Sequence, residues 1–166
     1  GEGFPNHHLA PRSKGCVARL SLVGNRLELV APMLNDQAKA FDVNQLKGKV
    51  VVVHYWSSQS DNYESDFNKL KRLMQDVGTK QNVELVCVCL DDTLVKAKEA
   101  VAKTSAPGIH LYQTPSNNAG GGQNSSLATQ YGIHILPTIF MVGRDGRVTN
   151  NALQVADIET ELKKVQ

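Results

Sequence analysis

The sequence predicts an α/β domain in which helices flank a central mixed β-sheet. Two nearly continuous apolar runs, residues 50–56 and 83–90, are typical of strands buried on both faces of a parallel sheet. Helical segments follow both runs, and parallel strands need such crossover connections. Arg144-Asp145-Gly146 indicates a hairpin turn near the end of the chain. This turn adds an antiparallel strand, so the sheet is expected to be mixed.

The N-terminal part is predicted to hold a tail followed by a β-hairpin. Residues 1–14 contain prolines and show no periodicity, as in a linker or a frayed tail. Residues 17–23 and 26–30 alternate apolar and polar side chains around Gly24-Asn25, which indicates a hairpin with its turn at these two residues.

Helices are predicted after both buried runs. Over residues 61–77, apolar side chains recur three and four positions apart and form one stripe, and Gly78 ends the helix. Asp92 and Thr93 are suited to cap a second helix over residues 94–103.

The remaining predicted elements are short. We expect an extended piece at 41–46, a strand at 109–112, a loop at 114–126, a helix at 126–131, strands at 138–142 and 147–149, and an amphipathic helix at 157–165.

Composition narrows the classes of function. The 166-residue chain has a formal net charge of +2 with scattered Lys and Arg, which does not indicate nucleic-acid binding. No apolar run approaches the ~20 residues of a membrane span. We expect a linker or flexible tail at 1–16 and one domain at 17–166. Because the chain begins with Gly1 rather than Met, we also expect it to be part of a longer protein.

The cysteines and histidines predict neither a disulfide framework nor a metal site. Cys16, Cys87 and Cys89 are an odd, low number, and no His or Cys grouping has zinc spacing. In a strand, Cys87 and Cys89 would lie ~6.5–7 Å apart, at or beyond the limit for a disulfide. We expect both to be buried, structural residues rather than a displaced redox pair. Cys16 shows no partner, and no metal or cofactor is expected.

Several segments, in order along the chain, carry a family resemblance. GKVVVVHYW at 48–56, VELVCVCLDD at 83–92, YGIHILPTIF at 131–140 and RDGRV at 144–148 resemble segments of the TlpA/ResA-like thiol–disulfide oxidoreductases, relatives of the AhpC/TSA redoxins. The similarity extends over roughly residues 17–166. It implies a thioredoxin-like fold with an N-terminal β-hairpin extension, and a bacterial, extracytoplasmic setting.

The sequence departs from this family at the active site. The family carries W-x-x-x-C-x-x-C, whereas this chain has WSSQSDNY from Trp56 to Tyr63. Ser60 therefore stands at the position of the attacking cysteine and Tyr63 at that of the resolving cysteine. Thiol–disulfide exchange needs a thiolate and then a second thiol, so neither residue supports it. No catalytic residue of the family is intact.

Ser60 has two interpretations. As a helix N-cap its hydroxyl would accept a hydrogen bond from a first-turn amide, a contribution of ~1 kcal/mol. As a nucleophile it would need a base and an oxyanion hole, and His54, His110 and His134 are the histidines available as bases. We favour the N-cap.

A peptide-binding groove is a second candidate site. The resemblance places Pro137, after Leu136, at the family's cis-proline turn, where the preceding backbone pairs with an extended peptide. Trp56 and Tyr63 either line this groove with aromatic surface or fill the space left by the missing sulfur atoms. Trp56, Leu136 and Pro137 are the groove candidates, and the partner would be an extended peptide or a protein.

Three hypotheses for function follow. The first is a redox-inactive thioredoxin-like domain that serves as a binding or structural module of a larger protein. The second is a thiol–disulfide oxidoreductase, if Ser60 replaces a natural cysteine or if a single-cysteine variant operates. The third is a peroxiredoxin-like peroxidase, which the absence of Pro and Cys between Trp56 and Tyr63 disfavours.

Overall fold

The computed structural model describes residues 21–78, 80–114, 126–133 and 135–164. Its strands are β1 (Val30–Met33), β2 (Asp36–Asp42), β3 (Val50–Trp56), β4 (Val83–Cys89), β5 (Ile109–Leu111), β6 (Thr138–Val142) and β7 (Val148–Leu153). Its helices are α2 (Tyr63–Val77), α3 (Leu94–Thr104), α4 (Ser126–Thr129) and α5 (Ile158–Lys164), with 3₁₀ turns at η1 (Val43–Leu46) and η3 (Val155–Asp157).

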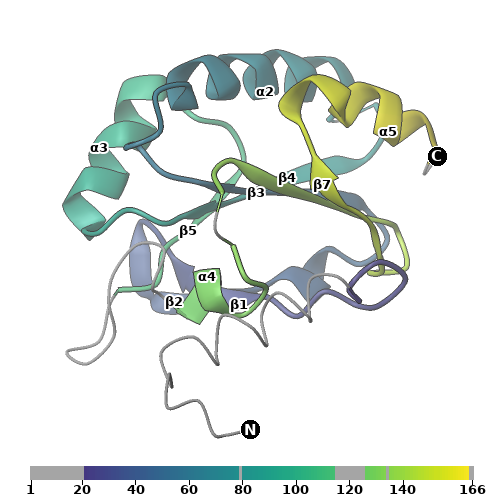
Figure 1. The fold of residues 1–166 in the computed structure, drawn as a ribbon, viewed down its shortest axis with the longest axis horizontal. Helices are drawn as coiled ribbons and strands as arrows, with labels where there is room; N and C mark the ends of the chain where they lie inside the picture. The colour runs from purple at the N-terminus through teal and green to yellow at the C-terminus, as the bar shows by residue number, and fades with distance from the viewer. Residues whose placement is uncertain (1–20, 79, 115–125, 134, 165–166) are drawn as a thin grey trace, which may run out of the picture.

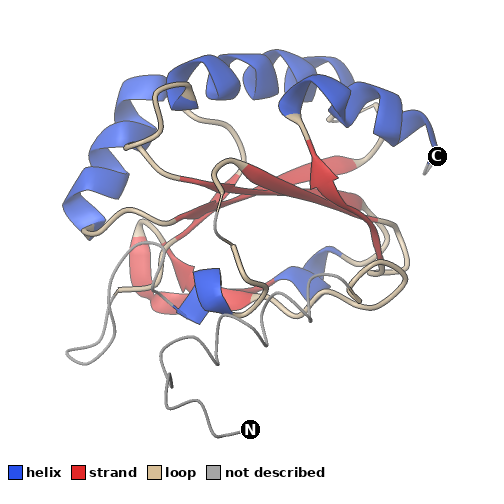
Figure 2. Ribbon diagram, in the orientation of Figure 1, coloured by secondary structure: helices blue, strands red, loops and turns tan. Residues whose placement is uncertain are grey.

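The seven strands form one sheet in the order β2-β1-β5-β4-β3-β6-β7. β3, β4 and β5 are parallel, and the remaining pairs are antiparallel. Helices α2, α3 and α5 lie over one face of the sheet and α4 lies on the other (Figures 1 and 2). The predicted mixed sheet flanked by helices is therefore confirmed.

Each face of the sheet has its own core. Side chains alternate along β3, so that Val51, Val53 and Tyr55 join the core on the α4 side. Val50, Val52 and Trp56 join the core beneath α2, α3 and α5. All seven residues of β3 are buried, as the continuous apolar run predicts.

The predicted N-terminal hairpin is wrong in its position. The hairpin of the structure is β1–β2, with its turn at Leu34-Asn35. At Gly24-Asn25 the chain instead turns against β7, where the Gly24 amide donates to the Val148 carbonyl at 2.8 Å. The reason is burial: Leu22, Leu27 and Leu29 are at most 4% exposed, because the segment packs into the core rather than against itself.

Two further boundaries differ from the sequence prediction. Of the extended piece expected at 41–46, only the first two residues belong to a strand, because the Asp42 carboxylate accepts from the Asn44 amide at 2.9 Å and starts a 3₁₀ turn. β7 continues to Leu153, beyond the predicted 147–149. The predicted tail at 1–16 and most of the loop at 114–126 lie outside the described residues. None of the described helices is long and apolar enough to cross a membrane.

Gly108 lies where the chain from α3 enters β5, and it offers a test of the close packing there. Its φ is +94°, and a Cβ would stand 2.5 Å from the Leu85 carbonyl oxygen. We expect Gly108→Ala to lower the free energy of unfolding by ~3 kcal/mol, through the φ strain and the clash with β4 together. Gly48→Ala is the matched control, because Gly48 has a φ of +98° but open space around it. It should cost only ~1 kcal/mol in urea denaturation. Equal losses would show that the contact with Leu85 has no effect.

Candidate functional site

The candidate site lies where β3 ends and α2 begins. A small pocket there is lined by His54, Trp56, Ser57, Ser60, Tyr63, Asp66 and Pro137. The structure thus brings together four of the predicted residues, Trp56, Ser60, Tyr63 and Pro137. Leu136 is the exception, since it is half-buried and packs toward the core on the α4 side. The Leu136–Pro137 peptide bond is cis.

Ser60 is not the N-cap of α2. The helix begins three residues later, and its N-cap is Asn62, which makes no side-chain capping bond. Ser60 contributes its backbone instead: its amide donates to the Ser57 carbonyl at 3.2 Å, and its carbonyl accepts from the Tyr63 amide at 3.3 Å. These bonds build two successive turns between β3 and α2. The helix therefore begins at Tyr63 and not at the predicted residue 61.

The described residues do not prepare Ser60 as a nucleophile. His54 lines the same pocket, but within the described part of the chain neither of its ring nitrogens has a hydrogen-bond partner. His110 uses one ring nitrogen on the Ala106 carbonyl, at 3.0 Å. His134, the third candidate base, lies outside the described residues. A serine nucleophile needs a hydrogen-bonded base, and none is present among the described residues.

The turn after β3 is held by Asp91, which directly follows the second apolar run, residues 83–90. Asp91 is 1% exposed, and its carboxylate accepts from the Ser57 hydroxyl at 2.6 Å, the Ser58 amide at 2.8 Å and the Ser58 hydroxyl at 2.7 Å. Its carbonyl accepts from the Tyr112 hydroxyl at 3.1 Å. One sequence signal could have revealed this role of Asp91: it is an acidic residue directly after a buried strand, β4, whose carboxyl end lies beside that of the parallel strand β3.

Trp56 and Tyr63 line the pocket as a stacked pair. Their ring centroids are 5.9 Å apart with an angle of 20° between the planes, and Phe67 meets the indole edge-on at 4.6 Å. Trp56 is only 1% exposed, whereas Tyr63 is half-buried. Trp56 therefore offers almost no surface for a groove, and Tyr63 is the aromatic residue at the surface.

His54 is an imidazole inside an otherwise apolar layer. It is fully buried, and its ring meets Phe67 edge-on at 5.3 Å. Burial, with a smaller effect of the nearby His110, lowers the pKa of His54 to about 3. Burial acts in the opposite sense on Asp66 of α2 and raises the pKa of that carboxyl, partly offset by Lys69. His54 is therefore neutral at physiological pH.

The described cysteines lie in the core and not at the pocket. Cys87 and Cys89 are 0% and 3% exposed and pack beneath α2 and α3, as predicted. Burial raises the pKa of both thiols well above their usual range. Neither thiol is available as a nucleophile at neutral pH. Cys16 lies outside the described residues.

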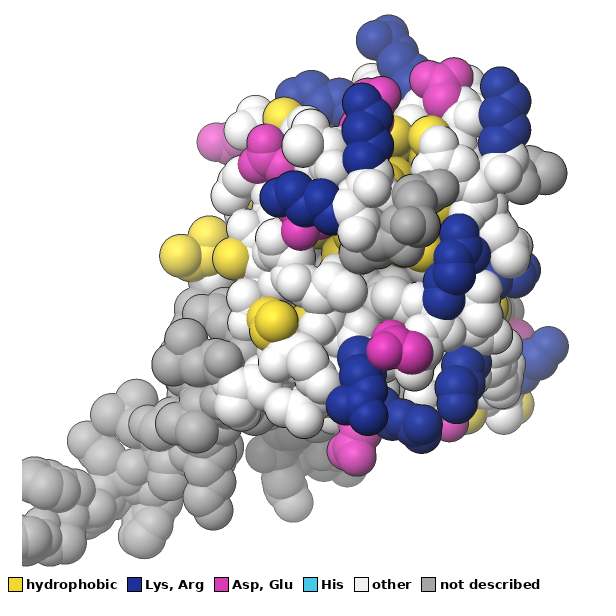
Figure 3. Space-filling view, turned by 90° about the vertical axis from the view of Figure 1, so that its right-hand side faces the viewer, with side chains coloured by type: hydrophobic (Ala, Val, Ile, Leu, Met, Phe, Trp, Pro, Cys, Tyr) yellow, Lys and Arg dark blue, Asp and Glu magenta, His cyan; other side chains and the backbone are white. Residues whose placement is uncertain are grey.

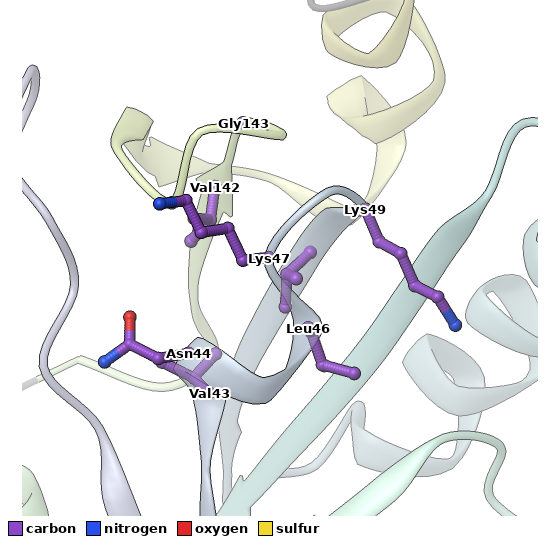
Figure 4. Close-up of a pocket in the computed structure, with 9 residues that line it drawn as sticks. Val43, Asn44, Leu46, Lys47, Lys49, Val142 and Gly143 are labelled. Carbon is purple, nitrogen blue, oxygen red and sulfur yellow. The ribbon is translucent and has the colours of Figure 1, made fainter.

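Two other hollows lie elsewhere among the described residues. The hollow in Figure 4, between η1 and the β6–β7 turn, has a volume of only about 10 Å³, and the Lys47 and Lys49 side chains extend from it in different directions. A larger groove of about 220 Å³ lies between α2 and α3 and is lined by Ser58, Tyr63, Lys96, Glu99, Ala100 and Lys103. Tyr63 is the one residue that this groove shares with the pocket at the start of α2.

Neither the surface charge nor the potential metal-binding side chains of the described residues indicate a further site. On the face shown in Figure 3, Lys and Arg side chains are spread over the surface with acidic side chains between them. This agrees with the low net charge of +2. Over the residues that the structure describes, no group of three or more His, Cys, Asp and Glu side chains could hold a metal ion.

Comparisons with known proteins agree with the fold. A family model described as thioredoxin-like matches residues 48–148, more than half of the chain. No curated protein matches the sequence. Solved structures similar to the chain include a thiol-disulfide oxidoreductase from Bacteroides fragilis, with 17% identity, a TM-score of 0.70 and coverage of 85% of this chain and 98% of that one.

Two other similar structures extend the comparison. The thioredoxin domain of a thiol-disulfide oxidoreductase from Bacteroides vulgatus has 18% identity and a TM-score of 0.71, covering 87% of this chain and 98% of its own. A secreted disulfide oxidoreductase from Mycobacterium tuberculosis has 15% identity and a TM-score of 0.63, covering 82% and 96%. At these identities the similarity establishes the fold and leaves the activity open.

The three bonds to the Asp91 carboxylate predict a large effect of its removal. Asp91→Ala would leave the buried Ser57 hydroxyl and the Ser58 amide without their acceptor, so we expect a loss of ~3 kcal/mol in the free energy of unfolding. Asp92→Ala is the matched control, since Asp92 is exposed and accepts one side-chain bond, from Gln59 at 3.2 Å. It should cost less than ~1 kcal/mol in urea titrations. Similar losses in the two variants would mean that the carboxylate does not hold the turn.

The buried His54 predicts that stability falls with acidity. Its pKa is about 3 when folded and ~6.5 when unfolded, so the unfolded chain binds more protons between these values. The stabilisation is complete above ~pH 6.5 and is lost toward pH 3, at up to ~1.4 kcal/mol per pH unit. His110, whose pKa burial also lowers, acts in the same direction. Asp66 acts in the opposite direction at lower pH, so the comparison is best made between pH 7 and pH 5.

The measurement is urea denaturation of the protein and of His54→Leu at both pH values. The variant should lose most of the pH dependence, and His110→Leu should lose only a smaller part of it. A free energy of unfolding that does not change between pH 7 and pH 5 in the unmodified protein would contradict the assignment of His54.

Proposed function

Because the chain belongs to the thioredoxin-like family, we propose that it is a thioredoxin-fold domain, residues 17–166, that does not catalyse thiol–disulfide exchange. It serves as a binding or structural module of a larger protein. Residues 1–16 are the proposed linker between this domain and the rest of that protein. Ser60 and Tyr63 take the two positions at which the related oxidoreductases carry cysteines.

The observation that carries this proposal is the chemistry around the start of α2. The pocket contains a hydroxyl and a phenol, from Ser60 and Tyr63, and no thiol among its lining residues. A serine hydroxyl is barely ionised at neutral pH and forms no disulfide, and the cysteines of β4 are buried with raised pKa values. Exchange has neither an attacking nor a resolving group here.

The proposed partner is an extended peptide or protein segment at the Pro137 turn. Pro137 is half-buried, and Ile135, two residues earlier, is 75% exposed, a large apolar side chain without cover. Tyr63 supplies the aromatic surface on the other side of the pocket, since Trp56 is covered. The proposed location is extracytoplasmic and bacterial; one of the similar structures is described as a secreted protein.

A thiol–disulfide oxidoreductase is the second candidate function. It requires that the natural residue at position 60 be a cysteine, which would act alone because Tyr63 cannot resolve a mixed disulfide. The favouring observation is the position of Ser60 in a pocket beside the cis-proline, with the architecture of the turn intact. The sequence of the natural gene at codon 60 decides this, and a serine codon eliminates it.

The direct test of the proposed function is reduction of insulin in the presence of dithiothreitol. We expect no turnover above the rate of dithiothreitol alone, because no accessible dithiol is present at the site. Turnover comparable to that of an intact thioredoxin would reject the proposal. Ser60→Cys with Tyr63→Cys should raise the rate at least tenfold, since it restores an attacking and a resolving thiol. Ser60→Cys alone is the matched control and should raise the rate less than the double variant, because only dithiothreitol is then available to resolve its mixed disulfide.

A further inference from the structure

Two imidazoles lie in one buried row of the sheet. His54 of β3 is in register with Cys87 of β4, and Cys87 is in register with His110 of β5, so the row crosses three adjacent parallel strands. Register partners in neighbouring strands point to the same face of a sheet, and Cys87 belongs to the core beneath α2, α3 and α5. Both imidazoles are therefore on the face that these helices cover.

Phe67 of α2 contacts both imidazoles. Its ring is edge-on to His54, with 5.3 Å between the ring centroids, and tilted relative to His110 at 6.4 Å. Within the described residues neither ring nitrogen of His54 has a hydrogen-bond partner, and His110 has one at Nε2, the Ala106 carbonyl, but none at Nδ1. An imidazolium needs an acceptor or water at both nitrogens, so charging either ring is costly while Phe67 covers it.

The first two turns of α2 are held to the domain by few contacts. Three of the fifteen residues of the helix are buried, and only Phe67 of these lies in the first two turns. The N-cap, Asn62, makes no side-chain capping bond. The Lys103–Glu64 ion pair, which joins α3 to this part of α2, is exposed and adds little stability. Segments with few buried contacts open locally before the whole domain unfolds, and such an opening would bring His54 into water.

The neutral groups that face His54 do not change charge near neutral pH. Burial raises the pKa of the Cys87 thiol in β4. Burial also raises the pKa of the Tyr63 phenol, which lines the same pocket as His54, although Lys103 acts against it. In β6 the residue in register with His54 is Ile139, which is apolar. His54 and His110 are therefore the groups of this layer whose protonation state can change between pH 7 and pH 5.

Asp66 is the acidic residue of α2 that lines this pocket. Burial raises the pKa of its carboxyl, and Lys69 partly offsets this rise. Uptake of a proton by Asp66 stabilises the closed helix, which opposes the effect of the imidazoles, but it occurs toward the usual carboxyl range of about pH 4. The effect of the two imidazoles is therefore best separated from that of Asp66 above pH 5.

We propose that the start of α2 is an acid-sensitive switch, in which protonation of His54 and His110 releases Phe67 from the sheet and opens the first two turns of the helix. Tyr63 lies in the first of these turns, so the opening also dismantles one side of the candidate site. Acid thereby weakens the binding of a partner there. This last consequence rests on the proposed function, whereas the opening itself does not.

Hydrogen exchange of the backbone amides in the full chain, followed by NMR at pH 7 and pH 5, measures the opening. Protection factors remove the intrinsic pH dependence of exchange. We expect the opening constant of amides 66–70 to rise about 20-fold toward pH 5, because the pKa of His54 is about 3 when buried and ~6.5 when exposed. Amides of α5, which packs on the same face, are the internal control, since neither histidine has a described ring contact with it. They should change less than threefold.

Variants and urea sharpen this test. His54→Leu should remove most of the 20-fold rise, and His110→Leu a smaller part of it. Exchange of amides 66–70 should depend less on urea than exchange of the amides of β4, because a local opening exposes less surface than unfolding of the whole domain.

Two results would overturn the proposal. One is equal protection and equal urea dependence of amides 66–70 and of β4, since α2 would then open only with the whole domain. The other is a change of less than threefold in the opening constant of amides 66–70 between the two pH values. If the histidine variants do not fold, these measurements on the unmodified protein decide alone. Insulin reduction separates the two ideas: turnover rejects the proposed function, whereas a helix insensitive to pH without turnover rejects only the switch.

Discussion

The burial of β3 on both faces is the constraint on which the rest of the structure depends. Every residue of the strand is buried, between parallel β4 and antiparallel β6. Side chains alternate, so two separate cores are needed, one beneath α2, α3 and α5 and one on the α4 side. His54 lies in this strand and is buried with it, which is why an imidazole without described partners sits beneath the start of α2. The turn that follows begins at the edge where β3 and β4 end together.

The architecture of the site does not depend on thiol chemistry. Asp91 holds Ser57 and Ser58 from the end of β4, and the Tyr112 hydroxyl binds the Asp91 carbonyl in turn. The position and shape of the turn are therefore maintained by hydrogen bonds that do not involve the side chains of Ser60 and Tyr63. At the other end of the turn, the Tyr63 ring packs against Trp56.

Patterns formed by residues close together in the sequence predicted the individual strands and helices well. The apolar runs of β3 and β4 and the stripe of Phe67, Leu70 and Val77 on α2 give the same elements in the structure. The misplaced hairpin has a cause that lies far away in the sequence. The turn at Gly24-Asn25 looks like a hairpin, but its partner is β7, more than one hundred residues away. The true hairpin has Leu34-Asn35 at its turn and carries no glycine signal.

The amino-acid sequence alone was enough to predict the mixed α/β fold, the order of most of its elements and the burial of Cys87 and Cys89. Through the family resemblance it also predicted Ser60 and Tyr63 at the active-site positions and Trp56, Leu136 and Pro137 at an adjacent groove. Of these five residues, Leu136 does not line the pocket. Only the tertiary structure decided that Ser60 is not a helix cap, that Asp91 holds the turn, and that Trp56 is covered by Tyr63. The physical reason is that exposure and hydrogen-bond partners depend on residues brought together from distant strands, whereas periodicity and turn signals are properties of neighbouring residues.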